Sequence, residues 1–233
     1  MGGTLWLGTS GFAYPEWKGV FYPEDLKNDG MLGFYAGRFP SVEVNYTFRR
    51  HPAEKTLERW AAETPEGFRF TLKAHQRITH TRRLRDADES VSMFLDRARL
   101  LGERLGTILF QLPPTFHYDR EALEGFLGYL PPVTRYAFEF RHPSWEEARG
   151  LLSDQGAAWV TAETDDQAPS AMSWEPFGYL RLRKEEYTDQ ELKVWADRIG
   201  QALGDGRDVY VYLKHEDKGA GPRFAERLRE LIG

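Results

Sequence analysis

The stretch YAFEFRHPSW, residues 136–145, carries the pattern that decides the fold. Its apolar residues Phe138 and Phe140 lie at every second position. The charged residues Glu139 and Arg141 take the alternate positions, and this period of two predicts a β-strand. In an open parallel sheet, helices cover both faces and central strands are almost continuously apolar. In a barrel, one face packs against helices and the other points inside, so the segment favours a barrel with charges in its interior.

Seven further segments alternate in the same way, and the eight strands are expected at residues 5–10, 41–47, 69–75, 107–112, 135–140, 158–163, 178–183 and 208–214. Helical periodicity predicts helices at residues 31–39, 53–63, 89–105, 119–130, 145–155, 189–203 and 221–231. This order predicts an α/β fold, a single (β/α)8 TIM-type barrel. The length of the chain fits this fold, which usually has about 250 residues. An open doubly wound sheet is the structural alternative. No linker or repeat divides residues 1–233, so we expect one domain.

The composition narrows the class of protein. The 233 residues are 41% hydrophobic and 29% charged, as in soluble globular proteins. The chain has no cysteine, which excludes disulfides, thiolate metal sites and cysteine nucleophiles. The net charge of -5 argues against broad non-specific binding of nucleic acid. We find neither a secretory signal nor an apolar run of about 18 residues, so we expect a cytoplasmic protein without membrane contact.

Polar side chains gather on the alternate positions of the predicted strands. These positions hold Glu43, Asn45, Thr71, Lys73, His75, Gln111, Glu139, Arg141, Thr161, Glu163, Arg181, Arg183 and Lys214. Burying unpaired charges costs several kcal/mol, so a stability core would use aliphatic residues instead. Most of these residues lie toward the C-terminal ends of their strands, where (β/α)8 enzymes have their active sites. The pattern therefore predicts a functional pocket at those ends.

This set is rich in cations, with Lys73, Arg141, Arg181, Arg183 and Lys214 as candidate substrate-binding residues. Guanidinium groups suit carboxylate and phosphate oxygens. The loop HEDKGAGPRFAERL, residues 215–228, follows the last strand, and barrel enzymes frequently hold phosphate near that loop. We therefore expect a small phosphate- or carboxylate-bearing substrate.

Glu43 and Glu139 are the candidate general acid and base, because paired carboxyls in a shielded site can hold different pKa values. His75 and His142 are alternative proton carriers. This chemistry would make the protein a hydrolase, lyase or isomerase. A divalent metal is left open as a cofactor, since carboxylates and histidines near strand ends include Glu43, His75, Glu139, His142, Glu163, Asp165 and His215. No short motif such as H-E-x-x-H identifies ligands.

Two other functions remain open. The basic stretch QRITHTRRLR, residues 76–85, and aromatic residues elsewhere on the predicted rim suit nucleic acid, which makes a metal-dependent nucleic-acid-directed hydrolase one alternative. A non-catalytic ligand-binding protein is the other. Sequence leaves the oligomeric state undetermined.

Six ordered motifs resemble the YecE-like proteins of domain-of-unknown-function family 72. They read GTSGFAYPEWKGVFYP, VEVNYTFRRHP, FRFTLKAHQRITH, LGTILFQLPPTF, YAFEFRHPSW and VYVYLKHEDKGAGPRFAERLREL. The resemblance implies a TIM-type barrel and no activity. The motif positions it marks are Ser10, Tyr14, Trp17, Glu43, Asn45, Thr47, Lys73, His75, His80, Gln111, Pro113, Glu139, Arg141, His142 and Trp145. Among them we take Ser10, Tyr14, Trp17, Asn45, Gln111 and Trp145 as further substrate-binding candidates.

The chain departs from this family near its end. Relatives commonly read YFNN after the last strand, where this sequence reads YLKH at residues 212–215. At the seventh strand they often read R-x-H-G, where this sequence reads RLRK at residues 181–184. Both departures add positive charge to the predicted pocket.

Overall fold

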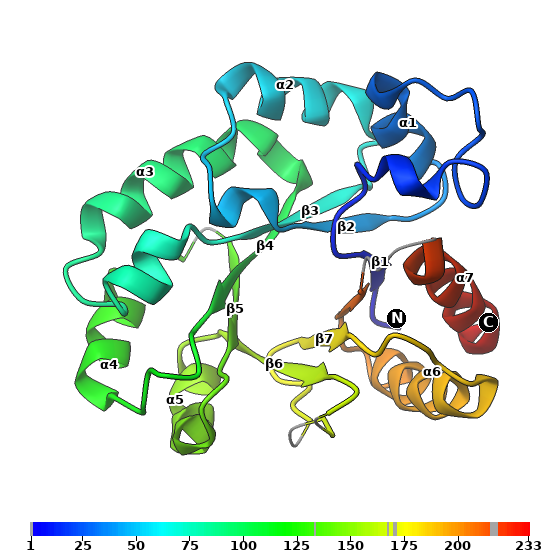
Figure 1. Cartoon of the computed structure of the whole chain (residues 1–233). Helices are drawn as coiled ribbons and strands as arrows, with labels where there is room; N and C mark the ends of the chain where they lie inside the picture. Colours follow the sequence, from blue (N-terminus) through cyan, green and yellow to red (C-terminus); the bar gives the residue numbers. More distant parts are fainter. Residues whose placement is uncertain (1, 133, 167, 170–171, 215–218) are drawn as a thin grey trace.

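The eight predicted strands form one parallel sheet that curls into a barrel (Figure 1). The computed structural model describes residues 2–132, 134–166, 168–169, 172–214 and 219–233. The strands are β1 Leu5–Thr9, β2 Ser41–Val44, β3 Arg69–Lys73, β4 Leu105–Gln111, β5 Arg135–Glu139, β6 Ala158–Glu163, β7 Gly178–Leu182 and β8 Val209–Leu213. Each pairs in parallel with its sequence neighbour from β2 to β8, and β1 pairs with β8. A bridge between Ser10 and Glu43 connects the two remaining edges, so the predicted barrel is confirmed.

Helices surround the strands on the outside of the barrel (Figure 1). They are α1 Met31–Ala36, α2 Glu54–Glu63, α3 Asp88–Ala98, α4 Arg120–Tyr129, α5 Arg149–Asp154, α6 Asp189–Gly204 and α7 Ala220–Ile232. Short helical turns are η1 Pro15–Trp17, η2 Asn28–Gly30, η3 Tyr46–Phe48, η4 Arg77–Thr81, η5 Arg99–Arg104 and η6 Pro143–Ala148. Within the described part of the chain, no helix combines the length and apolar character needed to cross a membrane.

Local sequence explains where α4 and α6 begin. Asp119 accepts a hydrogen bond from the backbone of Ala122 and so caps α4. Thr188 and Glu191 form a reciprocal capping box at the start of α6. Such caps satisfy backbone N–H groups that the first helical turn leaves without partners, so both starts follow from the sequence.

The barrel separates two hydrophobic layers, as the alternation predicts. Val42, Phe138 and Leu180 belong to the outer layer between strands and helices. The interior holds Leu109, Ala137, Ala158, Val160, Phe177, Tyr179, Tyr210 and Tyr212. The Tyr212 hydroxyl hydrogen bonds with Ser41 and Thr71 on strands that do not neighbour β8, at 2.6 and 2.8 Å. These contacts cross the interior, so the polar face of β2 and β3 points inward.

On β6, the predicted inward orientation of Thr161 and Glu163 is wrong. Ala158 and Val160 fill the interior, and Trp159 lies on the helix side with its ring against Phe140. Because side chains alternate along a strand, Thr161 and Glu163 share the outward face of Trp159. Glu163 accepts hydrogen bonds there from Tyr187 and from Trp195 of α6, at 2.9 and 3.0 Å. The bulk of Trp159 suits the helix layer on the outside of the barrel.

Candidate functional site

Arg181 of β7 lies inside the barrel toward the C-terminal ends of the strands, between two carboxylates. Its Nη2 donates a hydrogen bond to Glu43 Oε1 of β2 at 2.7 Å. Its Nη1 donates to Glu139 Oε2 of β5. The residues are almost fully buried, with exposed fractions of 1% for Arg181, 0% for Glu43 and 4% for Glu139. One guanidinium therefore brings together the two carboxylates that the sequence singled out.

Glu43 has hydrogen-bond donors on both of its carboxylate oxygens. Ser10 Oγ and Asn45 Nδ2 donate to Oε1 at 2.9 and 3.2 Å. The hydroxyl of Tyr179 donates to Oε2 at 2.7 Å. Burial alone would raise the pKa of Glu43, but the charge and hydrogen bonds of Arg181 hold this pKa below its usual range. These surroundings favour the anionic form of Glu43, and they bring the substrate-binding candidates Ser10 and Asn45 into direct contact with it.

Glu139 is held in the same protonation state. Arg141 Nε donates a hydrogen bond to Glu139 Oε1 at 3.1 Å. Burial would raise the pKa of Glu139, but the charges of Arg181 and Arg141 lower this pKa to about 2. The same buried guanidinium favours the anionic form of both Glu43 and Glu139, and their roles as general acid and base stay a prediction.

Two further cations share this end of the barrel. Lys73 is partly buried at the end of β3, and its Nζ lies 4.3 Å from the centre of the Phe48 ring. Burial and the charge of Arg181 lower the pKa of Lys73 to about 8. Arg183 follows β7, and its Nη1 is buried without a hydrogen-bond partner among the described residues. Burial and Arg181 also lower the pKa of Arg183. We call Glu43, Lys73, Glu139, Arg141, Arg181 and Arg183 the charged cluster.

The two predicted histidines have partners elsewhere. His75 stacks on His51, with ring centres 4.6 Å apart. The His142 ring lies against His117, with ring centres 3.8 Å apart and the planes tilted by 31°, and its Nδ1 caps η6 by accepting a hydrogen bond from the backbone of Ser144. No contact described for either ring reaches Glu43 or Glu139. Their place as proton carriers at the cluster therefore gains no support from the geometry.

His80 is the histidine that the structure places near the cations, and it was not among our candidate site residues. Its ring lies edge-on to Phe48 at 4.9 Å, and Thr79 Oγ1 lies 2.9 Å from its Nδ1. Burial and the charges of Lys73 and Arg141 lower the pKa of His80. The alternation ended before His80, and the signals that pointed to it were the basic stretch at residues 76–85 and its position in the third motif.

Neither predicted tryptophan is available to a substrate. Trp17 is fully buried and packs against Tyr14 and Tyr22. Trp145 is fully buried, and its indole N–H donates to the carbonyl oxygen of Phe116 at 2.6 Å. The prediction that these two residues bind substrate is therefore wrong. They are core residues, because their aromatic rings pack against other side chains of the fold.

Three remaining candidates border the cluster region. The Tyr14 hydroxyl donates to the backbone oxygen of Ser10 at 3.0 Å. Gln111 is buried at the end of β4, and its Oε1 has no partner in the described part of the chain. The backbone N–H of Lys214, directly after β8, donates to Leu182 at 2.9 Å. Their side chains stay predictions as substrate ligands.

The loop after β8 is only partly described. His215 and the next three residues lie outside the described residues. A side chain at Gly221 would place its Cβ 2.1 Å from the backbone oxygen of Lys214, so this glycine lets α7 approach the end of β8. Among the residues that the structure places, no three His, Asp or Glu side chains form a group able to hold a metal ion.

The basic stretch at residues 76–85 contains η4 and the turn that follows. Arg85 pairs with Asp119, and the Arg83 guanidinium lies 5.8 Å from the centre of the Phe116 ring. Arg77 and Arg82 are exposed. Two of the four arginines thus have partners within the fold, and nucleic-acid binding here stays a prediction.

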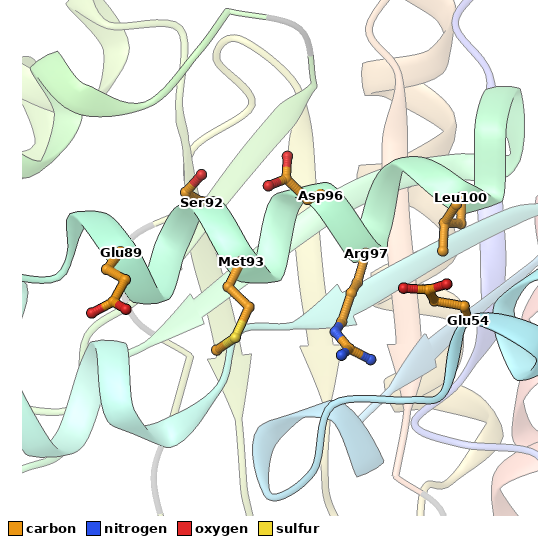
Figure 2. A pocket seen from close by; sticks show the side chains of 7 residues that line it. All are labelled: Glu54, Glu89, Ser92, Met93, Asp96, Arg97 and Leu100. Atoms are coloured by element: carbon orange, nitrogen blue, oxygen red, sulfur yellow. The ribbon is translucent and has the colours of Figure 1, made fainter.

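Several cavities open on the described part of the molecule, and two of them differ in their relation to the charged cluster. One of about 560 Å³ is on the outside of α3 and contains none of the predicted site residues (Figure 2). Another, of about 410 Å³, is lined by Tyr14, Asn45 and Trp60 among others, so Asn45 connects it to Glu43. Only the second borders the charged cluster.

Fold and cluster together define a (β/α)8 barrel protein with a charged site at the C-terminal end of the barrel. The family model described as "Protein of unknown function DUF72" matches residues 6–233. The chain belongs to the DUF72 family, which confirms the family indicated by the motifs.

Named relatives carry no stated activity. UPF0759 protein YecE of Escherichia coli K12 is 33% identical over 144 residues, which span 60% of this chain and 50% of that protein. UPF0759 protein YunF of Bacillus subtilis 168 is 23% identical over 279 residues, spanning 98% of this chain and 94% of that protein. Both are named as UPF0759 proteins, and neither name states a function.

Solved structures agree with the barrel. A DUF72 family protein from Thermotoga maritima has a TM-score of 0.79 at 25% identity, covering 98% of this chain and 99% of that one. A DUF72 family protein from Enterococcus faecalis has a TM-score of 0.79 at 17% identity, covering 98% and 95%. The second likeness shows the fold alone.

Proposed function

We propose that this protein is an enzyme that binds a small phosphate- or carboxylate-bearing substrate at the charged cluster. The observation that carries the proposal is the charge balance. Four cations, Lys73, Arg141, Arg181 and Arg183, face two carboxylates, Glu43 and Glu139, which leaves an excess of two positive charges in the described part of the cluster. Of these cations, Lys73, Arg181 and Arg183 are wholly or partly buried, where charge without a counter-ion is costly, and an anionic ligand would supply the missing charge.

The cations differ in what they offer to a ligand. Arg181 uses both terminal nitrogens on Glu43 and Glu139, so we assign it to holding the site together. Arg183 has a buried Nη1 without a described partner, and burial together with the charge of Arg181 lowers its pKa. The Arg141 side chain is 44% exposed and uses Nε on Glu139, which leaves its terminal nitrogens for a ligand. We assign Arg183, Arg141 and Lys73 to anion binding.

Replacing Arg183 with methionine is expected to weaken binding of inorganic phosphate by about 10- to 100-fold, because a charge-assisted hydrogen bond contributes roughly 1.5–3 kcal/mol. Isothermal titration calorimetry of the full chain at low salt measures this affinity. The matched control is Arg120→Met, since Arg120 lies on α4 and pairs on the surface with Glu124. The control is expected to bind phosphate like the wild type.

Two results would count against the proposal. One is phosphate and acetate both failing to bind the wild-type protein at millimolar concentration. The other is affinity that is unchanged in Arg183→Met and falls in a variant lacking Arg77 and Arg82. That second result would favour the exposed basic stretch and the nucleic-acid alternative.

A further inference from the structure

We propose that Lys73 is the catalytic amine of this site and forms an imine with an aldehyde or ketone group of the anionic substrate. This inference rests on the proposed function and deepens it, because it restricts the substrate to carbonyl compounds that also carry a carboxylate or phosphate. The chemistry requires an amine that is uncharged for part of the time and open to a ligand.

The position of Lys73 meets this requirement. It is the last residue of β3, at the barrel end where Glu43, Glu139 and Arg181 meet. Among the residues that the structure describes, its ammonium makes no salt bridge, and it lies over the Phe48 ring in a cation–π contact. Partial burial keeps the side chain in reach of a ligand while removing part of its hydration. A lysine in such surroundings is readily deprotonated.

The charges around Lys73 act in both directions. Burial and the guanidinium groups of Arg181 and Arg141 favour the neutral amine, whereas Glu139 and Glu43 favour the ammonium. The balance sets a pKa of about 8 against an ordinary 10.5, so the neutral fraction near pH 7 is roughly 300-fold larger than for an ordinary lysine.

Lys184 shows the contrast within the same barrel. Its ammonium pairs with Glu191 at 2.7 Å and with Glu163 at 3.6 Å. The hydrogen bond to Glu191 raises the pKa of Lys184 and keeps it charged. Lys184 therefore acts as a structural cation, and the absence of such a carboxylate contact separates Lys73 from it.

The reaction balances without a further reactant. The Lys73 nitrogen attacks the carbonyl carbon, and its proton moves to the carbonyl oxygen to give a carbinolamine. Loss of water then leaves the C=N bond. His80 shares the Phe48 ring with Lys73, and its lowered pKa keeps its imidazole neutral and able to accept and return a proton. Arg183 and Arg141 would hold the anionic group of the substrate.

The test is reductive trapping of the wild-type full chain with glyoxylate, an aldehyde with a carboxylate, and sodium cyanoborohydride. Peptide mass spectrometry compares the rate of labelling at Lys73 with that at the exposed Lys55 of α2. We expect Lys73 to react at least about 10-fold faster near neutral pH, with a rate that levels off above its pKa of about 8. Glycolaldehyde, which lacks the anion, is expected to lose most of this preference.

The outcomes separate this inference from the proposed function. Phosphate binding together with equal labelling of Lys73 and Lys55 would overturn the imine and leave the anion site intact. Preferential labelling of Lys73 by both aldehydes, unaffected by added phosphate, would support the reactive amine and count against the anion site. Lys73→Arg is expected to lose the preferred site of labelling, because a guanidinium stays protonated and does not form the imine.

Discussion

Replacing Arg181 with methionine is expected to lower the free energy of unfolding by about 3–5 kcal/mol, because breaking a buried ion pair leaves uncompensated charge in the core. Glu43 and Glu139 both depend on this guanidinium and are almost inaccessible to water. Methionine has similar length and fills much of the same space. The fall in the free energy of unfolding should therefore come mainly from the lost charge and not from a cavity. Urea denaturation near neutral pH, followed by far-UV circular dichroism, measures it.

Arg183→Met is the matched control, since Arg183 lies two residues further along the same chain segment and makes no ion pair among the described residues. We expect its effect on stability to stay within about 1 kcal/mol or to be favourable, because it removes like-charge repulsion with Arg181. Adding Glu43→Gln and Glu139→Gln to Arg181→Met should restore part of the lost stability. Equal losses in Arg181→Met and Arg183→Met would contradict the distinct roles given to the two arginines.

The sequence predicts the barrel well because alternation is a local property that repeats in every strand. It fails on β6, where both faces carry small or polar residues and Trp159 decides which one turns outward. A period of two in the sequence identifies the two faces of a strand. Which face points into the barrel and which packs against the helices depends on the volume available in each layer. On β5 and β7 the apolar faces are unambiguous, and the inward positions of Glu139 and Arg181 are predicted correctly.

Less of the site follows from the sequence. Alternation predicts that Glu43, Glu139 and Arg181 point inward, but it does not tell which cation pairs with which anion. That pairing depends on the stagger of strands far apart in the chain, and it decides that both carboxyls stay ionised. His80 and Trp145 were misjudged for a related reason, since their orientation depends on the path of the chain after the strands end.

Stability is expected to fall as the pH decreases from about 4.5 to about 2, the range between the unfolded and folded pKa values of Glu139. A carboxyl whose folded pKa is lowered stabilises the fold above its unfolded pKa and loses that contribution as acid protonates it. The lowered pKa of Glu139 corresponds to about 3 kcal/mol at neutral pH. Glu43 adds a contribution of the same sign.

Glu139→Gln is therefore expected to be about 3 kcal/mol less stable than the wild type at neutral pH, with the difference shrinking toward pH 2. Urea denaturation across this pH range measures both curves. The control is Glu191→Gln on α6, because the hydrogen bond from Lys184 also lowers the pKa of Glu191 to about 2. The Glu191 side chain is 40% exposed, so solvent screening should limit its effect to about 1 kcal/mol or less. Parallel curves for wild type and Glu139→Gln would show that Arg181 does not hold Glu139 as a buried anion.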